Sequence, residues 1–400
     1  MTKIATIVKN DLCLGCGLCS AIDSNCTMQL NTKGFYRPHF QQTNVNSEKI
    51  LTALCPGIHI HATKTKKNNS AWGNIEAVSN AWATDKNIRQ SSSSGGVTSA
   101  LAIYLLETHQ VDAVLHVGTE QGSFLYNKLH ISKTREEILS RNASRYAPAL
   151  IFDHIIEILD ANTDTFAFIG KPCDIAGIKN ILAYYPKYQN RIKFFLAIFC
   201  AGMPSYNATM KAIQTFGNPT APISLQYRGN GWPGYFTVKF ENGKTSQMTY
   251  NDSWGKILGK ELGFRCKICP DGIGLLADIA SGDAWNTKDG YPDFTESDGK
   301  NFCFIRTKNG KALFDAALKA GYITEEILNV ACVRDMQKYQ YTRRHYVGWR
   351  IAIVQLLSGG ILSFQNLGYG KMALKANIKR GVKEALGTVK RFYKVRRKNG

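Results

Sequence analysis

The chain has 400 residues, of which 44% are hydrophobic and 20% charged, and a formal net charge of +20. This length allows about two or three domains and excludes a small scaffold that needs disulfides for stability. Its eleven cysteines are better explained as reduced, metal-binding residues of a cytoplasmic protein, since residues 1–4 begin no signal-peptide segment. The most apolar run, residues 351–362, is interrupted by Ser358-Gly359-Gly360 and falls short of the roughly 20 residues that a membrane span requires.

The first motif places three thiolates on one tight loop at Cys-x2-Cys-x2-Cys spacing, with the cysteines Cys13, Cys16 and Cys19. Ferredoxin-type [4Fe-4S] sites begin in this way, and a fourth ligand often comes from a separate Cys-Pro pair. Cys55 is followed by proline, whereas Cys26 is followed by threonine, so we favour Cys55 as the fourth ligand and leave Cys26 as a spare. The alternative is a zinc site, although zinc sites more often pair two Cys-x2-Cys hooks.

The pattern of elements predicts three parts. Residues 1–62 are expected to form a small ferredoxin-like [4Fe-4S] module with little regular structure, and residues 64–70 a polar linker. The next part alternates: strands are predicted at 75–84, 111–118, 166–170 and 192–200, and helices at 97–107, 151–159 and 176–184. Such alternation predicts an α/β core with a mixed sheet over residues 71–335, with a hairpin turn at Asn242-Gly243. Residues 336–400 are expected to form a basic helical tail.

A second set of cysteines lies in this core. Cys173 precedes a predicted helix and Cys200 ends a predicted strand, so we expect both to face one crevice at the carboxyl ends of the strands. Cys266 and Cys269 add a Cys-x2-Cys hook followed by proline. Together the four residues suffice for a second [4Fe-4S] cluster. The alternative is that Cys173 and Cys200 are ordinary buried residues, as free cysteines often are. Two cysteines in apolar surroundings are predicted to be core residues, Cys303 and Cys332.

A run of four serines and two glycines, residues 91–96, opens directly into the apolar helix predicted after it. Backbone N–H groups at such a helix start attract anions, and a nucleotide pyrophosphate is the natural guest. The run is neither a Walker A loop nor a G-x-G-x-x-G fingerprint. The alternative is a serine-rich helix cap.

Six motifs follow one another in a specific order, at Cys13–Cys19, Ser93–Thr98, Gly170–Cys173, Cys200–Ser205, Cys266–Asp271 and Ala277–Trp285. Over about residues 8–310 this order resembles the coenzyme F420 hydrogenase/dehydrogenase beta-subunit family, which includes 7-hydroxymethyl chlorophyll a reductase. Members of that family are iron–sulfur flavoproteins with FAD and one or two [4Fe-4S] clusters. They pass electrons between a deazaflavin or ferredoxin-like donor and an acceptor.

The resemblance implies site residues. It implies a core cluster on Cys173, Cys200, Cys266 and Cys269, and the FAD diphosphate near Ser93, Ser94, Gly95, Gly96 and Val97. The glycine-rich stretch 227–234 would lie near the flavin, where Arg228 offsets diphosphate charge or stabilises a reduced, anionic flavin; the alternative is an arginine in a surface turn. Asp278 and Asp283 would bind ribityl hydroxyls or lysine partners, or serve as structural turn residues.

We therefore expect an iron–sulfur flavoprotein oxidoreductase that passes electrons between a ferredoxin- or F420-type carrier and a substrate, through two [4Fe-4S] clusters and FAD. The alternative is a non-catalytic electron-transfer subunit that docks on a partner enzyme. No sequence feature is specific for F420, and no histidine stands out as a catalytic acid.

The tail holds half of the net charge, because residues 371–400 carry eleven Lys or Arg and one acid, Glu384. Its apolar residues fall at helical spacing: Ile378, Val382, Ala385, Leu386, Val389, Phe392 and Tyr393. Such a helix is typical of peripheral contact with the anionic inner face of a membrane. The alternative is a helix docked on its own domain or on a partner subunit. Nucleic acid is disfavoured because no nucleic-acid module accompanies the charge.

Overall fold

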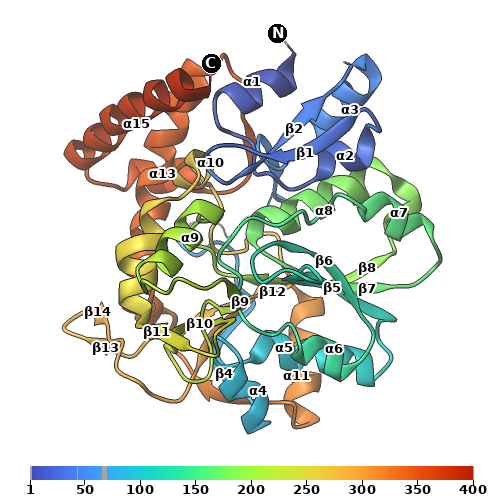
Figure 1. The fold of residues 1–400 in the computed structure, drawn as a ribbon, viewed down its shortest axis with the longest axis vertical. Coiled ribbons are helices and arrows are strands. Elements are labelled where there is room, and N and C mark those ends of the chain that lie inside the picture. The colour runs from blue at the N-terminus through green and yellow to red at the C-terminus, as the bar shows by residue number, and fades with distance from the viewer. Residues whose placement is uncertain (1, 43, 65–69, 400) are drawn as a thin grey trace.

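An eight-stranded mixed sheet organises the computed structural model, which describes residues 2–42, 44–64 and 70–399 (Figure 1). The strands run in the order β16-β4-β15-β12-β8-β7-β5-β6, and the central β12, β8, β7 and β5 are parallel. Their bounds are β4 Ala77–Ala83, β5 Ala113–Thr119, β6 Asn127–Ser132, β7 Phe166–Gly170, β8 Ile192–Ile198, β12 Ile279–Asp283, β15 Asn301–Ile305 and β16 Ile323–Ile327. The predicted α/β core with a mixed sheet is confirmed.

Helices cover both faces of this sheet (Figure 1). Alternating side chains of β7 explain why: Phe166 and Phe168 join the core beneath α8 (Pro172–Tyr184), whereas Ala167 joins the core beneath α5 (Val97–Glu107) and α11 (Lys308–Lys319). Shorter helices lie between the strands: α4 Lys86–Ser91, α6 Arg135–Leu139 and α7 Ile155–Asp160.

Helix α5 has the predicted bounds, but α7 begins four residues later than expected. The Phe152 N–H donates to the Cys16 carbonyl at 2.8 Å, so this backbone is held by the N-terminal segment instead of starting the helix. Helix α8 begins four residues earlier than expected, because the Asp174 carboxylate accepts a hydrogen bond from the Lys171 backbone N–H at 2.9 Å and a proline occupies the first position of the helix.

The second half of the core adds a three-stranded antiparallel sheet of β9 (Pro222–Gln226), β10 (Phe236–Phe240) and β11 (Thr245–Met248). The predicted Asn242-Gly243 turn joins β10 and β11, with Gly243 in the left-handed region at φ +80°. Helix α9 (Tyr206–Gln214) and a helical segment, Asn251–Ile257, complete this part.

The expectation of little regular structure in residues 1–62 is wrong. This segment forms α1 (Lys3–Lys9), α2 (Leu18–Ile22), β1 (Cys26–Leu30), β2 (Tyr36–Phe40), α3 (Val45–Leu54) and β3 (His59–His61). The helical spacing that predicts α1 and α3 was present in the pairs Ile4/Ile7 and Leu51/Leu54, whose side chains are buried in the main core. Most of the predicted linker, residues 65–69, lies outside the described residues.

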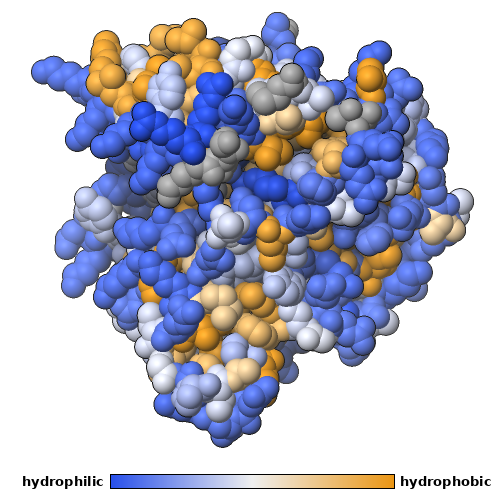
Figure 2. Space-filling view, turned by 45° about the horizontal axis from the view of Figure 1, so that its top comes forward, coloured by the Kyte–Doolittle hydropathy of each residue, from blue (hydrophilic) through white to orange (hydrophobic). Residues whose placement is uncertain are grey.

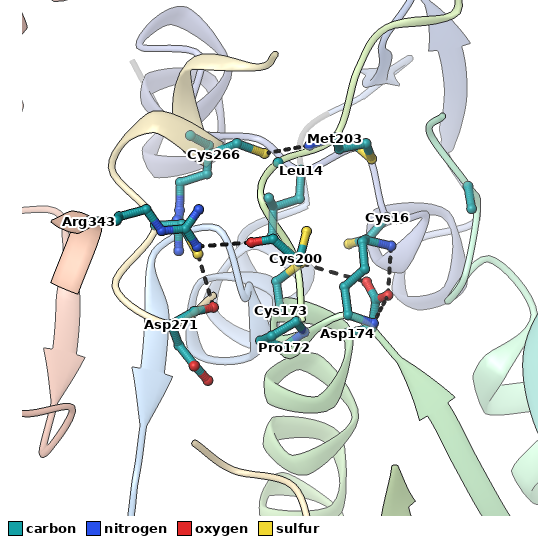
Figure 3. Close-up of a pocket in the computed structure, with 15 residues that line it drawn as sticks. Leu14, Cys16, Pro172, Cys173, Asp174, Cys200, Met203, Cys266, Asp271 and Arg343 are labelled. Carbon is teal, nitrogen blue, oxygen red and sulfur yellow. Dashed lines mark hydrogen bonds and ion pairs between the residues drawn. The ribbon is translucent and has the colours of Figure 1, made fainter. Parts of the chain in front are cut away.

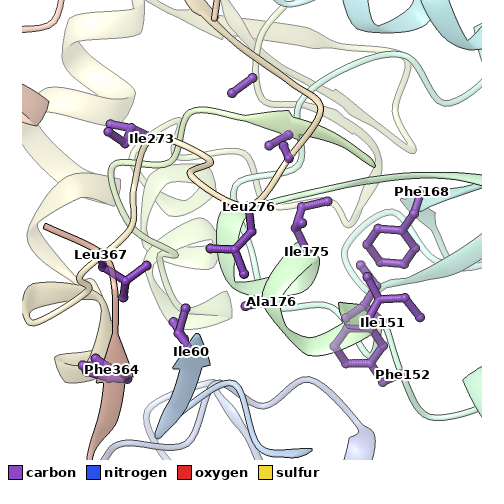
Figure 4. Close-up of a cluster of buried hydrophobic side chains, with 14 of the residues drawn as sticks. Ile60, Ile151, Phe152, Phe168, Ile175, Ala176, Ile273, Leu276, Phe364 and Leu367 are labelled. Carbon is purple, nitrogen blue, oxygen red and sulfur yellow. The ribbon is translucent and has the colours of Figure 1, made fainter. Parts of the chain in front are cut away.

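The two ends of the chain meet. Strand β3 pairs in parallel with β17 (Ser363–Gln365), and both ends contribute side chains to the main core, among them Ile60, Phe364 and Leu367 (Figure 4). The remaining elements of this region are α12 (Val333–Met336), α13 (Lys338–Leu357), α14 (Tyr369–Leu374) and α15 (Ile378–Asn399). Among the described helices, none is long and apolar enough to cross a membrane.

The two lone cysteines differ. Cys303 on β15 is fully buried, as predicted. The prediction that Cys332 is a core residue is wrong: it is exposed in a short surface turn, and the next residue, Val333, supplies the buried side chain of this turn.

A buried histidine links stability to pH. On β5, the His116 ring shares a 2.8 Å hydrogen bond with the Ser132 hydroxyl. Burial first, and then the charges of Arg141 and His130, lower the pKa of His116 to about 4. The unfolded chain takes up this proton near its ordinary pKa of about 6.5, so the stabilisation is complete above that pH and is lost as the pH falls toward about 4.

We expect the free energy of unfolding to fall by about 2–3 kcal/mol across this interval because of His116. The variant His116→Gln should flatten that part of the profile, and urea denaturation at a series of pH values measures it. The exposed His154 gives the matched control, His154→Gln, which should retain the wild-type slope. An unchanged slope in His116→Gln would contradict the assignment.

Candidate functional site

The first cysteine set surrounds a small enclosed cavity. Four cysteines line this cavity. Cys13 and Cys16 lie on the turn between α1 and α2, Cys19 lies in the first turn of α2, and Cys55 follows the last turn of α3. The turn needs glycine at position 17, where φ is +88° and a Cβ would lie 2.7 Å from the backbone nitrogen of Asp153. The structure therefore brings the four predicted residues together. Cys26, at the start of β1, lies beside Cys19.

The second set lines another cavity (Figure 3). Cys173 lies in the first turn of α8, and Cys200 follows β8. Cys266 lies in α10 (Phe264–Lys267), and Cys269 follows that helix. Strands β7 and β8 are parallel neighbours, so the segments after their carboxyl ends lie at one edge of the sheet, where ligands usually bind. The Met203 N–H donates to the Cys266 sulfur at 3.4 Å.

The donor chemistry of both cavities fits iron–sulfur clusters. Burial raises the pKa of Cys55 to about 11 and that of Cys200 to about 12, so these thiols require a cationic ligand to become thiolates near neutral pH. Within the described residues, no group of three or more His, Cys, Asp or Glu side chains is arranged to hold a single metal ion. Cluster ligands instead surround a cavity, since each of the four irons in a cubane takes one thiolate.

The third cavity lies beyond the second and measures about 200 Å³. Hydroxyl groups at the start of α5 form one wall, and aromatic rings and cations form the others. The lining residues include Ser93, Ser94, Thr98, Tyr146, Lys171, Arg228, Tyr250, Trp254, Asp283, Trp285 and Gln340. Gln340 is 2% exposed and its side-chain oxygen has no hydrogen-bond partner. Hydroxyls at a helix start, flat rings and an unpaired buried acceptor are a set that fits a nucleotide cofactor such as FAD.

Neighbouring cavities share walls. Cys16 lines both the first and the second, and Leu14 does the same. Lys171 and Cys200 line both the second and the third. The ammonium of Lys171 is held by Asp174 at 2.7 Å. The three cavities therefore form one continuous series.

The residues predicted to bind the diphosphate, 93–97, have two different roles in the structure. Ser93 and Ser94 line the third cavity, and the Ser94 hydroxyl donates to the Lys300 carbonyl at 2.9 Å. The Val97 N–H donates to the Asn301 side-chain oxygen at 3.3 Å, and Gly95 packs so closely that a Cβ would lie 2.8 Å from the Asn301 nitrogen. Gly96 begins α5 with φ +76°. Ser93 and Ser94 thus contribute the cavity surface, and the following residues fix the turn.

Arg228 forms a two-pronged ion pair with Asp283, with both N···O distances at 3.0 Å. Its guanidinium also lies 4.9 Å from the ring centres of Tyr250 and Trp285. The side chain is 2% exposed, so the alternative of an arginine in a surface turn is wrong. Burial favours the neutral guanidine, but the Asp283 carboxylate outweighs it and raises the pKa of Arg228.

The neighbouring acid, Asp278, has the structural role that the sequence left open. Its two carboxylate oxygens accept hydrogen bonds from the Thr307 hydroxyl at 2.6 Å and from the Phe195 N–H at 2.9 Å.

The sequence analysis missed the arginines that hold the cysteine loops. Arg265 donates to the carbonyls of Pro56 and Gly57, directly after Cys55. Arg343 donates to the carbonyls of Cys200 and Ala201 at 3.1 and 3.2 Å. Arg344 donates to the carbonyl of Pro270, directly after Cys269, at 2.7 Å. No local spacing signals these contacts, because the partners are between about seventy and more than two hundred residues apart in the sequence.

The fold and its cavities define an α/β protein with a mixed sheet and two buried four-cysteine sites. The chain belongs to the coenzyme F420 hydrogenase/dehydrogenase beta-subunit family: the profile of the family's N-terminal part matches residues 78–155, and that of its C-terminal part matches residues 163–330. The resemblance noted from the sequence is therefore confirmed.

Individual relatives are distant. The chain is 26% identical to the coenzyme F420 hydrogenase subunit beta of Methanococcus voltae over 63% of this chain and 84% of that protein. It is 25% identical to the F420-dependent formate dehydrogenase subunit beta of Methanocaldococcus jannaschii over 60% and 59% of the two chains. A chain in the F420-reducing [NiFe] hydrogenase complex of Methanosarcina barkeri has the same fold, with a TM-score of 0.55 and 21% identity over 76% of this chain and 99% of that one.

Removal of the Arg344 guanidinium should destabilise the fold. Arg344 is 1% exposed and donates to three carbonyls, of Ala71, Pro270 and Leu367, at 2.9, 2.7 and 2.6 Å. Buried hydrogen bonds to a charged group contribute about 1.5–3 kcal/mol each, so Arg344→Met should cost about 3 kcal/mol or more. Chemical denaturation measures the loss. Arg334→Met is the control, because the Arg334 side chain is exposed; equal stability of the two variants would contradict the prediction.

Breaking the Arg228–Asp283 pair should be similarly costly, since Asp283→Asn leaves a buried cation without its carboxylate. We expect a loss of about 3 kcal/mol in the free energy of unfolding. Asp335→Asn, which breaks an exposed pair with Arg334, should cost less than about 1 kcal/mol. Thermal or chemical unfolding compares the two variants. If Asp283→Asn lost less free energy of unfolding than Asp335→Asn, the assignment of a buried, paired Arg228 would be wrong.

Proposed function

We propose that this chain is an iron–sulfur flavoprotein oxidoreductase with two [4Fe-4S] clusters and one FAD. The first cluster is assigned to Cys13, Cys16, Cys19 and Cys55, the second to Cys173, Cys200, Cys266 and Cys269, and FAD to the third cavity. The observation that carries the proposal is the series of shared walls: Cys16 belongs to the first two cavities, and Cys200 to the second and third. Cofactors held in adjoining cavities of this kind would be placed to pass electrons from one to the next.

Bound FAD supplies two-electron hydride chemistry, and [4Fe-4S] clusters supply one-electron transfer. The residues of the chain hold, shield and tune these groups. Eight thiolates provide ligands in two partly enclosed cavities. Arg343, 3% exposed, places its positive charge beside Cys200 and Cys269 and offsets thiolate charge. Lys171, between the second and third cavities, is paired with the Asp174 carboxylate.

The diphosphate of FAD is assigned to Ser93, Ser94 and the start of α5 at Gly95, Gly96 and Val97. The N-terminal end of α5 provides the backbone N–H groups and the dipole that such an anion needs, whereas the hydroxyls of Ser93 and Ser94 donate to the carbonyls of Arg228 and Lys300 and form the cavity surface beside it. Trp285 and Tyr250 supply an aromatic wall of this cavity for an isoalloxazine ring, and the guanidinium of Arg228, paired with Asp283, packs on both rings. Because Asp283 neutralises Arg228, we assign Arg228 to positioning near the flavin and not to free anion binding.

The electron carrier is proposed to be of the ferredoxin or F420 type. The names of the relatives carry the F420 assignment, since they are an F420 hydrogenase subunit and an F420-dependent dehydrogenase subunit.

A second candidate is a non-catalytic electron-transfer subunit that docks on a partner enzyme. One observation favours it: several relatives are named as beta subunits, and the similar solved chain belongs to a hydrogenase complex.

The decisive experiment quantifies iron, zinc and flavin on one anaerobically purified sample and records its absorption spectrum. Two clusters and one flavin require about eight irons and one FAD per chain, with broad absorbance near about 400 nm. Cys13→Ala and Cys266→Ala should each reduce the iron to about four per chain. Cys303→Ala and Cys26→Ala are the matched controls and should keep about eight. Stoichiometric zinc without iron or flavin after reconstitution would contradict the proposal.

The two candidates are separated by turnover. The isolated chain is mixed with reduced F420, or with reduced ferredoxin, and a dye acceptor. Steady reduction of the dye supports an enzyme that acts alone. Reduction of the bound flavin once, seen as loss of its absorbance without continued reduction of the dye, supports the electron-transfer subunit.

A further inference from the structure

Helix α15 turns one face toward the protein. Gly381 packs against Trp349, and Phe392, which is 1% exposed, packs on Phe264 with ring centres 6.1 Å apart. Glu384 forms a 3.0 Å ion pair with Arg350 of α13. The sequence-based alternative of a helix docked on its own domain therefore accounts for this face. It does not account for the others.

A second face is apolar and exposed. Ile378, Val382, Leu386 and Tyr393 are between 45% and 69% exposed. They are spaced by four, four and seven residues, so they share one side of the helix. At about 1.5 Å per residue this stripe is about 22 Å long. Leu374, at the end of α14 and four residues before Ile378, is 88% exposed. Together these five residues form the apolar stripe.

A third face is basic and adjoins the apolar stripe. It consists of the exposed residues Lys379, Lys383, Lys390 and Lys394. Three of them directly follow a stripe residue in the sequence, which places them about 100° further around the helix. Glu384, the one acid among residues 371–399, points the other way into its ion pair with Arg350. The end of the molecule that carries α15 shows hydrophobic and hydrophilic side chains side by side at the upper left of Figure 2.

We propose that α15 binds the surface of an anionic lipid bilayer, lying in the plane of the headgroups. The apolar stripe enters the boundary of the acyl chains, and the lysines contact lipid phosphates. This inference is independent of the proposed redox function.

Charge and shape select this occupant. In a symmetric contact between two copies through the stripe, the lysine faces would meet and repel each other. A bilayer instead offers a broad negative plane to a single convex helix that already has its own domain behind it. Helix α15 lies at the upper left of Figure 1, whereas α4 lies at the bottom and α5 in the lower part of the view.

The test is sedimentation of the purified full-length holoprotein with vesicles of phosphatidylcholine, with and without phosphatidylglycerol. We expect binding to the vesicles that contain phosphatidylglycerol to be about tenfold stronger or more, and to weaken as salt is added. The double variant Ile378→Glu/Leu386→Glu removes the apolar contact, and Lys383→Glu/Lys390→Glu removes the phosphate contacts. Each should reduce binding about tenfold or more.

Matched controls use exposed residues elsewhere. Ile327 on β16 is 97% exposed, so Ile327→Glu adds the same charge at an exposed isoleucine away from α15. Lys239→Glu/Lys244→Glu reverses two exposed charges on and beside β10. Both controls should bind vesicles as the parent does, and circular dichroism checks that every variant is folded.

Three outcomes would overturn the proposal. The first is no binding to vesicles that contain phosphatidylglycerol at low salt. The second is equal loss in the α15 variants and in the controls. The third is that α15 binds a second copy or an acidic protein and does not bind vesicles. Light scattering would then show an increase in molar mass that Ile378→Glu/Leu386→Glu abolishes.

Discussion

Buried arginines that donate to loop carbonyls are the interaction on which the candidate site depends. The loops after Cys55, Cys200 and Cys269 are short and irregular, so their carbonyls have no partners in a helix or a strand. Arg265, Arg343 and Arg344 supply those partners from inside the protein. A guanidinium suits this task because it remains charged when buried and carries five donors in a fixed plane. The same charges oppose the negative charge that thiolate ligands bring, so the contacts that fix the loops also favour metal binding.

This arrangement explains why the C-terminal region is part of the site. Arg343 and Arg344 belong to α13, whose sequence lies beyond the part that the family profiles match. Gly272 leaves the space that the Arg343 guanidinium occupies, because a Cβ there would clash with it. The pairing of β17 with β3 then joins the C-terminal region to the N-terminal module. Residues from both ends of the chain, Cys16 and Arg343 among them, therefore line the second cavity.

The order of the cavities follows from the sheet. Parallel strands β7 and β8 end side by side, which places Cys173 and Cys200 at one edge. The turn of Cys13, Cys16 and Cys19 lies against the α7 region through the hydrogen bond between Phe152 and Cys16. The start of α5 approaches the same edge from the other face of the sheet, so Ser93 and Ser94 line a cavity that Cys200 also lines. One edge of a parallel sheet thus positions all three proposed cofactor sites.

The sequence by itself determined the features that depend on near neighbours in the chain. The alternation of apolar strands and helices gave the α/β core, the Cys-x2-Cys spacing marked each group of candidate ligands, and the helical repeat of α15 marked its apolar residues. Ile4/Ile7 and Leu51/Leu54 carried a helical signal as well, because residues three apart lie on one face of a helix. Tertiary structure alone decided which distant residues meet. Arg344 reaches the loop after Cys269, Cys16 is shared by two cavities, and α15 buries Phe392 while exposing Leu386. These contacts join residues far apart in the sequence, where local spacing carries no information, and they are fixed by how the packed elements bury their apolar faces.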